Sequence, residues 1–344
     1  MAEDFSPFGT NLFGQPVGPT DKGGPLAQRF ILPPFTVLST RDGAWQERKR
    51  AWVSLGIRSE EGRGENALGL SAACEDYREG TGEYSRMLRK QFTDWMADKA
   101  GGNRGNDKGT SVFDPVLCEL CYRWFCPPGG LVLDPFAGGS VRGVVAAMLG
   151  RRYHGIELRA EQVLANRQQA DAIVAPTGSP MPTWVEGDSR EHLAAAPDAD
   201  LVFTCPPYGD LERYSDDPRD LSTYTYPQFR AALRDVLLAA AARLRQDRFL
   251  VVVVGEFRNK KSGLYHGWVP DLVADLRDAG LGYYNHAVVV TPVGSLPIRT
   301  ANQFRASRKM GKTHQDVVVF VKGDAFKATE AIGNADTDSM EDPS

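Results

Sequence analysis

The chain has 344 residues, of which 42% are hydrophobic and 24% are charged, and its formal net charge at pH 7 is -4. These are ordinary globular values, and the length fits one large α/β domain with additions or two domains. The mildly acidic balance excludes a chain that is basic throughout, so any nucleic-acid surface must be gathered locally. No apolar run approaches the roughly 20 residues that a membrane-spanning helix needs.

The N-terminal third lacks a regular pattern. Residues 1–30 are rich in Gly and Pro and predict a flexible N-terminal arm. Residues 31–110 mix aromatic with basic residues and predict an N-terminal extension, which is a candidate for target recognition. Within it, the basic and aromatic cluster from Arg41 to Trp52 fits either a DNA-contacting segment or a helix packed by its Trp residues.

From residue 111 strands and helices alternate, which predicts a catalytic domain over residues 111–325. We expect strands at residues 131–133, 153–157, 184–186, 201–203, 249–254, 287–291 and 316–321. We expect helices at residues 112–125, 141–149, 226–244 and 269–279. A further helix is expected after the strand at 153–157 and runs to about residue 172. This alternation is typical of an α/β fold with a mostly parallel, doubly wound sheet. The polar and acidic residues 326–344 predict a disordered tail.

A turn of small residues follows the first strand of this domain. It consists of Asp134, Pro135, Phe136, Ala137, Gly138, Gly139 and Ser140. Ligands of open α/β sheets bind at the carboxyl ends of strands, and small residues let the backbone approach them closely. The turn has neither a Walker nor a GxGxxG pattern, so its ligand need not carry phosphates. Glu157 ends the next strand, where its carboxylate suits ribose hydroxyls, and Asp188 follows the strand after that, where it suits an adenine amino group. Together the two acids predict an adenosine-containing ligand.

A second motif follows the fourth strand. Its residues are Cys205, Pro206, Pro207 and Tyr208. Two consecutive prolines fix φ and cannot continue a strand ladder, so they make a rigid exit from the sheet. Such a turn suits a site that holds a planar substrate, on which Tyr208 can stack.

The two motifs resemble those of the amino-directed DNA methyltransferases, DPF-x-G-S-G and Asp/Asn/Ser-Pro-Pro-Tyr/Phe. Phe113-Asp114-Pro115 resembles that family's extra cofactor segment, and CPPYGDLERYSDDPRDLS is similar to predicted DNA methylases of actinobacterial phages and prophages. The resemblance implies a Rossmann-like class I S-adenosylmethionine-dependent methyltransferase fold, with a mostly parallel seven-stranded sheet whose last strand is antiparallel. It implies a cytoplasmic protein, bacterial or phage-encoded, that methylates double-stranded DNA for restriction-modification or for regulation.

The resemblance also implies roles for single residues. The methyl group of S-adenosylmethionine would pass to cytosine N4 or adenine N6 of a base flipped out of the stack. Phe113 would pack near the methionine part, Tyr208 would stack on the base, and the Pro206 region would offer a carbonyl to the amino group.

Cys205 departs from the family pattern, in which Asp, Asn or Ser occupies this position. A thiol is a weak hydrogen-bond acceptor, so it would bind the target amino group less well. In one interpretation Cys205 takes the place of Ser, and Asp210 or Glu212 supplies the stronger hydrogen-bond acceptor that the thiol lacks. In another, Cys205 is a nucleophile that activates a pyrimidine for C5 methylation, which is sound thiolate chemistry. A methyltransferase of RNA or protein and a non-catalytic DNA-binding module are further alternatives.

Residues 294–315 carry a local excess of positive charge and no acid. The basic residues of interest are Arg299, Arg305, Arg308, Lys309 and Lys312. We expect a loop that binds DNA phosphates, each contact adding a salt-dependent term, although an exposed hairpin whose charge only aids solubility has the same composition.

We expect no metal site. Cys118, Cys121 and Cys126 lie in an apolar, aromatic stretch without a second ligand pair, which is typical of core packing. The odd total of 5 cysteines, with no signal-peptide pattern, predicts a reducing compartment.

Overall fold

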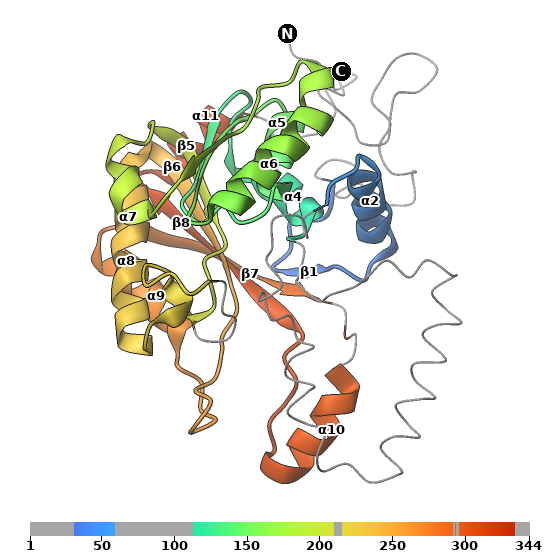
Figure 1. Ribbon diagram of the computed structural model, residues 1–344, viewed down its shortest axis with the longest axis vertical. Helices are drawn as coiled ribbons and strands as arrows, with labels where there is room; N and C mark the ends of the chain where they lie inside the picture. Colours follow the sequence, from blue (N-terminus) through green and yellow to red (C-terminus); the bar gives the residue numbers. More distant parts are fainter. Residues whose placement is uncertain (1–30, 59–112, 210–214, 292, 294–295, 334–344) are drawn as a thin grey trace.

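The computed structural model describes residues 31–58, 113–209, 215–291, 293 and 296–333, and no side chains at 298 and 299. The predicted arm, most of the predicted extension and residues 334–344 lie outside the described residues. Over the described residues an 8-stranded sheet lies between two layers of helices (Figure 1), in the strand order β1-β7-β8-β6-β5-β2-β3-β4.

The elements have the following bounds. The strands are β1 (Val37–Ser39), β2 (Leu131–Asp134), β3 (Arg152–Glu157), β4 (Thr183–Glu186), β5 (Ala199–Thr204), β6 (Leu244–Val254), β7 (Gly282–Val290) and β8 (His314–Lys322). The α-helices are α2 (Gly43–Ser54), α4 (Pro115–Phe125), α5 (Val141–Met148), α6 (Ala160–Ile173), α7 (Ser189–His192), α8 (Tyr226–Arg243), α9 (Trp268–Asp278), α10 (Leu296–Ser307) and α11 (Ala325–Ile332).

The sheet confirms the predicted α/β class and corrects the number of strands. β8 runs antiparallel to both β6 and β7, and the other paired strands are parallel. Each predicted strand is present, with the predicted antiparallel last strand. The additional strand is β1, in which Val37 pairs with Val288 of β7. Three residues are too few to show the alternation by which a strand is predicted from sequence.

Successive residues of the central strands face two separate hydrophobic cores. In β6, Val251 and Val253 pack with the α4, α5 and α11 side, whereas Leu250 and Val252 pack with the α8 and α9 side. A strand buried on both faces requires a continuous apolar run rather than alternation. The run FLVVVV of β6 therefore lies in the middle of the sheet.

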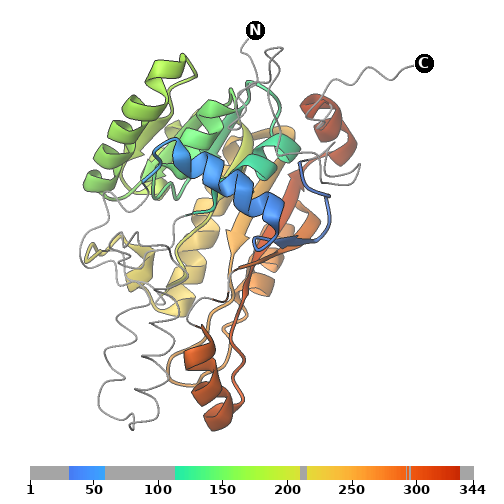
Figure 2. The ribbon, with the colours of Figure 1, turned by 90° about the vertical axis from the view of Figure 1, so that its right-hand side faces the viewer.

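The cluster from Arg41 to Trp52 is largely a packed helix. Helix α2 lies across α4 (Figure 2), with Trp45 and Trp52 fully buried. Arg48 donates two hydrogen bonds to the buried Glu119, at 2.6 and 2.7 Å, and the Trp52 indole donates a third at 2.7 Å. Burial would raise the pKa of Glu119, but the charge and hydrogen bonds of Arg48 outweigh it and the pKa is lowered.

The disordered tail predicted from residue 326 begins with residues that form a helix. Helix α11 covers residues 325–332, and its Ala328 and Ile332 are buried against the sheet. The Asp324 carboxylate caps this helix by accepting from the backbone N–H groups of Phe326 and Lys327. The prediction was wrong here because the acidic residues further along dominate the average composition of the segment.

Candidate active site

The carboxyl ends of β2, β3, β4 and β5 meet at one edge of the sheet, where they border a cleft. The predicted residues that line it are Phe113, Pro135, Phe136, Gly138, Gly139, Glu157, Asp188, Cys205 and Pro207. The small-residue turn after β2 and the proline turn after β5 therefore open into one space. Parallel strands with adjacent ends produce this arrangement.

Three residues of the small-residue turn lie beneath the cleft rather than in its wall. Asp134 is fully buried, and its carboxylate accepts hydrogen bonds from the hydroxyls of Thr204 at 2.7 Å and Tyr153 at 2.8 Å. Ala137 and Ser140 are also fully buried. The structure therefore places Asp134 as a link between β2, β3 and β5, and these three residues support the turn instead of facing a ligand.

Glu157 ends β3 and faces the cleft with a side chain that is 11% exposed. Its carboxylate accepts from the backbone N–H of Gly138 at 2.9 Å and of Arg159 at 3.1 Å. Burial raises the pKa of Glu157, and the Arg159 charge and these hydrogen bonds offset it only in part. Because each carboxylate oxygen has two lone pairs, the group can still accept from the hydroxyls of a ribose.

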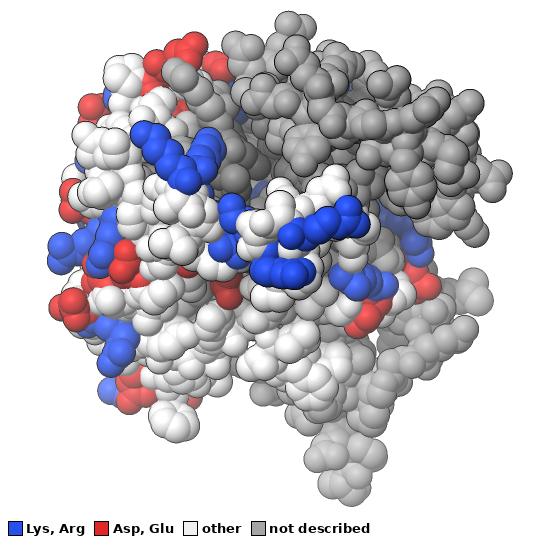
Figure 3. Space-filling view, turned by 90° about the horizontal axis from the view of Figure 1, so that it is seen from below, with Lys and Arg blue, Asp and Glu red and all other residues white. Residues whose placement is uncertain are grey.

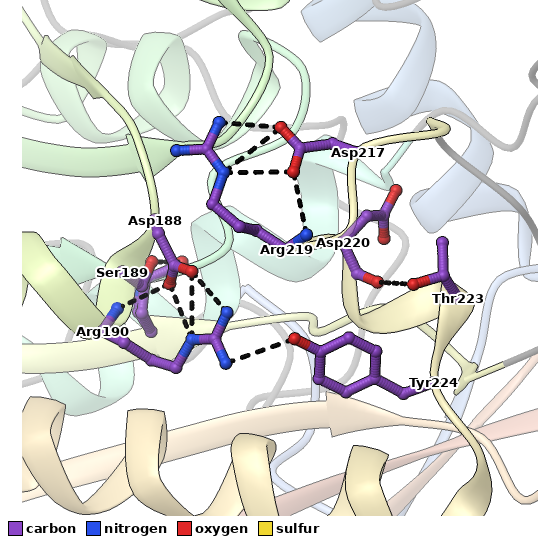
Figure 4. A network of polar contacts seen from close by, with 9 residues as sticks. Asp188, Ser189, Arg190, Asp217, Arg219, Asp220, Thr223 and Tyr224 are labelled. Carbon is purple, nitrogen blue, oxygen red and sulfur yellow. Dashed lines mark hydrogen bonds and ion pairs between the residues drawn. The ribbon is translucent and has the colours of Figure 1, made fainter.

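Asp188 lies in the cleft wall but is shared with Arg190 (Figure 4). Its carboxylate caps α7 by accepting from the Arg190 N–H at 2.9 Å and also accepts from the Arg190 guanidinium. Burial would raise the pKa of Asp188, but the hydrogen bonds from Arg190 outweigh it and the pKa is lowered. The contact of Asp188 with an adenine amino group stays a prediction.

Sequence reasoning missed the arginines of the cleft wall, which are Arg142, Arg159, Arg190 and Arg219. Their ion-pair partners are Asp134, Glu157, Asp188 and Asp217, respectively. The last three pairs are separated by one residue in the sequence, and Figure 4 shows two of them. The pattern acid-x-Arg at the ends of β3 and β4, and again in the loop after β5, is the signal that could have found three of these arginines.

The proline turn brings Cys205 and Tyr208 together. The Cys205 thiol lies 3.8 Å from the Tyr208 hydroxyl, which also accepts a 2.7 Å hydrogen bond from the Gln315 amide of β8. The Tyr208 ring lies 6.3 Å from the ring of Trp268, which begins α9. Pro206 is buried. Contacts from β8 and α9 therefore hold Tyr208 at the end of β5, while Asp210 and Glu212 lie outside the described residues.

Lys312 lies beside the proline turn. A methyl group on Gly255 would be 3.2 Å from the Tyr208 ring and 3.4 Å from the Lys312 ammonium, so both side chains border Gly255. The ammonium donates to the Glu256 carbonyl at 3.2 Å. Burial lowers the pKa of Lys312, against the opposing charge of Asp316. Lys312 therefore lies close to the ring of Tyr208, and its contact with DNA stays a prediction.

The predicted basic loop contains a helix, α10, which ends at Ser307. Arg305 and Arg308 are exposed, and the Arg308 guanidinium lies 5.4 Å from the ring of Phe304, itself 43% exposed. Arg299 lies within α10, but its side chain is outside the described residues. The position of the segment between the last two predicted strands favoured a loop, although Pro is accepted in the first turn of a helix.

The cysteines of α4 and its end are core residues. Cys118, Cys121 and Cys126 are buried, and burial raises the pKa of Cys126 to about 12. Among the described residues there is no group of three His, Cys, Asp or Glu side chains that could hold a metal ion. No described helix has the length and apolar character to cross a membrane.

The cleft has an apolar wall and a hydrogen-bond acceptor, which fit a nucleoside. Phe136, Ile156 and Leu221 supply apolar wall, and Glu157 supplies an acceptor for ribose hydroxyls. Gly138 adopts φ +52°, a conformation that other residues seldom take, and its N–H is turned to Glu157. The residues present thus fit S-adenosylmethionine, whose adenosine would be held by the apolar wall and Glu157.

Comparison with known proteins gives matches in sequence and matches in structure. Residues 70–168 match a family model described as "DNA methylase". The relative "Putative methylase YubD" of Escherichia coli (strain K12) is 34% identical over 89 residues, which is 25% of this chain and 37% of that protein. The solved structure of TrmN from Thermus thermophilus has 20% identity and a TM-score of 0.40, over 60% of this chain and 48% of that one.

A second solved structure, magnesium protoporphyrin IX methyltransferase (ChlM) from Synechocystis PCC 6803 with bound SAM, has 14% identity and a TM-score of 0.39, over 71% of this chain and 99% of that one. Likeness at this level does not bear on the substrate. The family match covers Phe113, the small-residue turn and Glu157, and the sheet order is the class I methyltransferase arrangement that the motifs implied. Residues 70–168 are therefore similar to DNA methylases, and the cleft that they help to line fits S-adenosylmethionine.

Proposed function

We propose that this protein transfers a methyl group to an exocyclic amino group of a DNA base, either cytosine N4 or adenine N6. The observation that carries the proposal is the shared cleft. Cys205 and Pro207 of the proline turn line the same space as Gly138 and Glu157 of the cofactor side. A base amino group held at the proline turn would therefore lie next to the cofactor.

The chain's own residues would bind and orient the base. When bound, S-adenosylmethionine supplies an electrophilic methyl group to a nucleophilic nitrogen. Tyr208, held by Gln315 and bordered by Trp268, offers its ring as a stacking partner for the flipped base. The carbonyl of the Pro206 region would accept a hydrogen bond from the amino group and orient its lone pair toward the methyl group.

DNA would reach the cleft along a basic surface. Arg305 and Arg308 are exposed on and just after α10, with Phe304 beside them. Figure 3 shows Lys and Arg side chains across the middle of this end of the molecule, with some Asp and Glu side chains beside them and others toward one edge. Such a local excess in a net acidic chain supports binding to phosphates.

One observation favours a second candidate, C5 methylation of a pyrimidine. The Cys205 side chain lines the cleft beside the cofactor side. A thiolate there could add to C6 of the base and leave as a thiolate after methyl transfer and loss of the C5 proton.

Transfer of labelled methyl from S-adenosylmethionine to duplex DNA, tRNA and protein tests the proposal, followed by mass spectrometry of the nucleosides. We expect label in DNA, as N4-methylcytosine or N6-methyladenine, and its loss in Tyr208→Ala. 5-Methylcytosine would establish the second candidate, and label confined to tRNA or protein would refute both.

A further inference from the structure

The turn between β6 and α9 is an ordered, exposed hairpin. Arg258 and Tyr265 form an antiparallel bridge, and the Asn259 N–H donates to the Leu264 carbonyl at 2.9 Å. The Asn259 side chain accepts from the N–H groups of Lys261 at 3.0 Å and Ser262 at 2.9 Å. These bonds hold the backbone at the tip of the hairpin, from which Lys260 and Lys261 extend.

The hairpin lies between the proline turn and α10. At its base, Phe257 packs against Gly209, since a methyl group on Gly209 would lie 2.8 Å from the Phe257 ring. Near its tip, Gly263 lies against Lys309, whose ammonium would be 2.4 Å from a methyl group there. In Figure 1 the hairpin extends below α9, toward the same end of the molecule as α10.

The hairpin is basic and is continuous with the basic surface of α10. Lys260 and Lys261 at the tip are exposed, and the Arg258 guanidinium lies 3.6 Å from the ring centroid of Tyr265. Residues 257–270 and 279–315 contain no Asp or Glu. Two acid-free segments that are distant in sequence thus meet at the Gly263–Lys309 contact, in a chain whose net charge is -4.

We propose that the β6–α9 hairpin binds the phosphate backbone of duplex DNA through Lys260 and Lys261, next to the base held at the proline turn. The proposal rests on the proposed function and names a second contact that the basic stretch around α10 does not include. The hairpin and α10 would contact phosphates at two places and hold the target base near Tyr208. Each neutralised phosphate releases a counterion, so each contact adds about 0.9 to the slope of log affinity against log salt concentration.

The test is fluorescence anisotropy with a labelled DNA duplex, titrated with the full chain at several salt concentrations. The double variant Lys260→Gln/Lys261→Gln should lower the slope by about 2 and weaken binding about tenfold or more at 0.1 M salt. The matched control is Lys327→Gln/Arg152→Gln, which removes two exposed charges on α11 and at the start of β3. It should leave slope and affinity unchanged.

The outcomes separate this inference from the proposed function. Wild-type protein that binds DNA, with the same slope in the hairpin variant, would overturn the role of the hairpin alone. Equal losses in the hairpin and control variants would show a general charge effect and overturn it as well. Tighter binding of an RNA duplex of the same sequence would overturn the assignment to DNA, and no salt-dependent binding by wild-type protein would refute the proposed function itself.

Discussion

Replacing Glu157 with Gln should weaken cofactor binding while leaving the fold intact. The carboxylate accepts from the backbone N–H groups of Gly138 and Arg159 and faces the cleft. Glutamine has nearly the same shape, but one oxygen becomes an NH2 group that can only donate. That group would face either one of the backbone donors or a ribose hydroxyl that needs an acceptor.

The size of the effect follows from the hydrogen bond that is lost. A hydrogen bond to a charged group is worth about 1.5–3 kcal/mol, and each 1.4 kcal/mol is roughly a factor of ten in affinity. We therefore expect Glu157→Gln to raise the Kd for S-adenosylhomocysteine about 10- to 150-fold, as measured by isothermal titration calorimetry.

Glu186 provides a matched control on the neighbouring strand. It pairs in register with Glu157, is exposed and does not line the cleft. Glu186→Gln should bind S-adenosylhomocysteine like the wild type, and both variants should keep the wild-type melting temperature. An unchanged Kd in Glu157→Gln would refute the role of this carboxylate, and a large fall in its melting temperature would show that the carboxylate mainly holds the turn.

Three further changes test the site. Because burial raises the pKa of Glu157, its carboxylate gains a proton at a pH above the ordinary pKa of 4.5. Calorimetry should show the affinity for S-adenosylhomocysteine falling as the pH is lowered toward 4.5, because the protonated carboxyl is a weaker acceptor. Glu157→Gln should abolish this dependence. Cys205→Ser should retain methyl transfer to DNA under the amino-directed reaction, and complete loss in a folded variant would support the C5 alternative. Gly209→Ala should lower the free energy of unfolding by about 1–3 kcal/mol in urea, because φ is +52° and the new methyl group would lie 2.8 Å from Phe257; wild-type stability would contradict this conformation.

The sequence alone predicted those features that a few neighbouring residues determine. The apolar run of β6, the small-residue turn from Asp134 and the proline turn from Cys205 each have a local physical signature. Strand ends in a parallel sheet meet at one edge, so their order along the chain also predicted that Glu157 and Asp188 would face the same cleft.

Contacts between distant segments decided the rest. Strand β1 forms because β7 offers a free edge to Val37–Ser39, and α2 is stable because the buried Glu119 on α4 accepts from Arg48.

In the same way, Asp134 lies in a turn that suits ligand binding, yet Thr204, Tyr153, Arg142 and the Phe136 N–H occupy its carboxylate oxygens. Lys312 belongs to a basic stretch, yet its position just before β8 places it beside Tyr208. Sequence spacing sets which residues share one strand or turn, whereas the partners that satisfy a buried charge come from elsewhere in the chain, and only the folded structure brings them together.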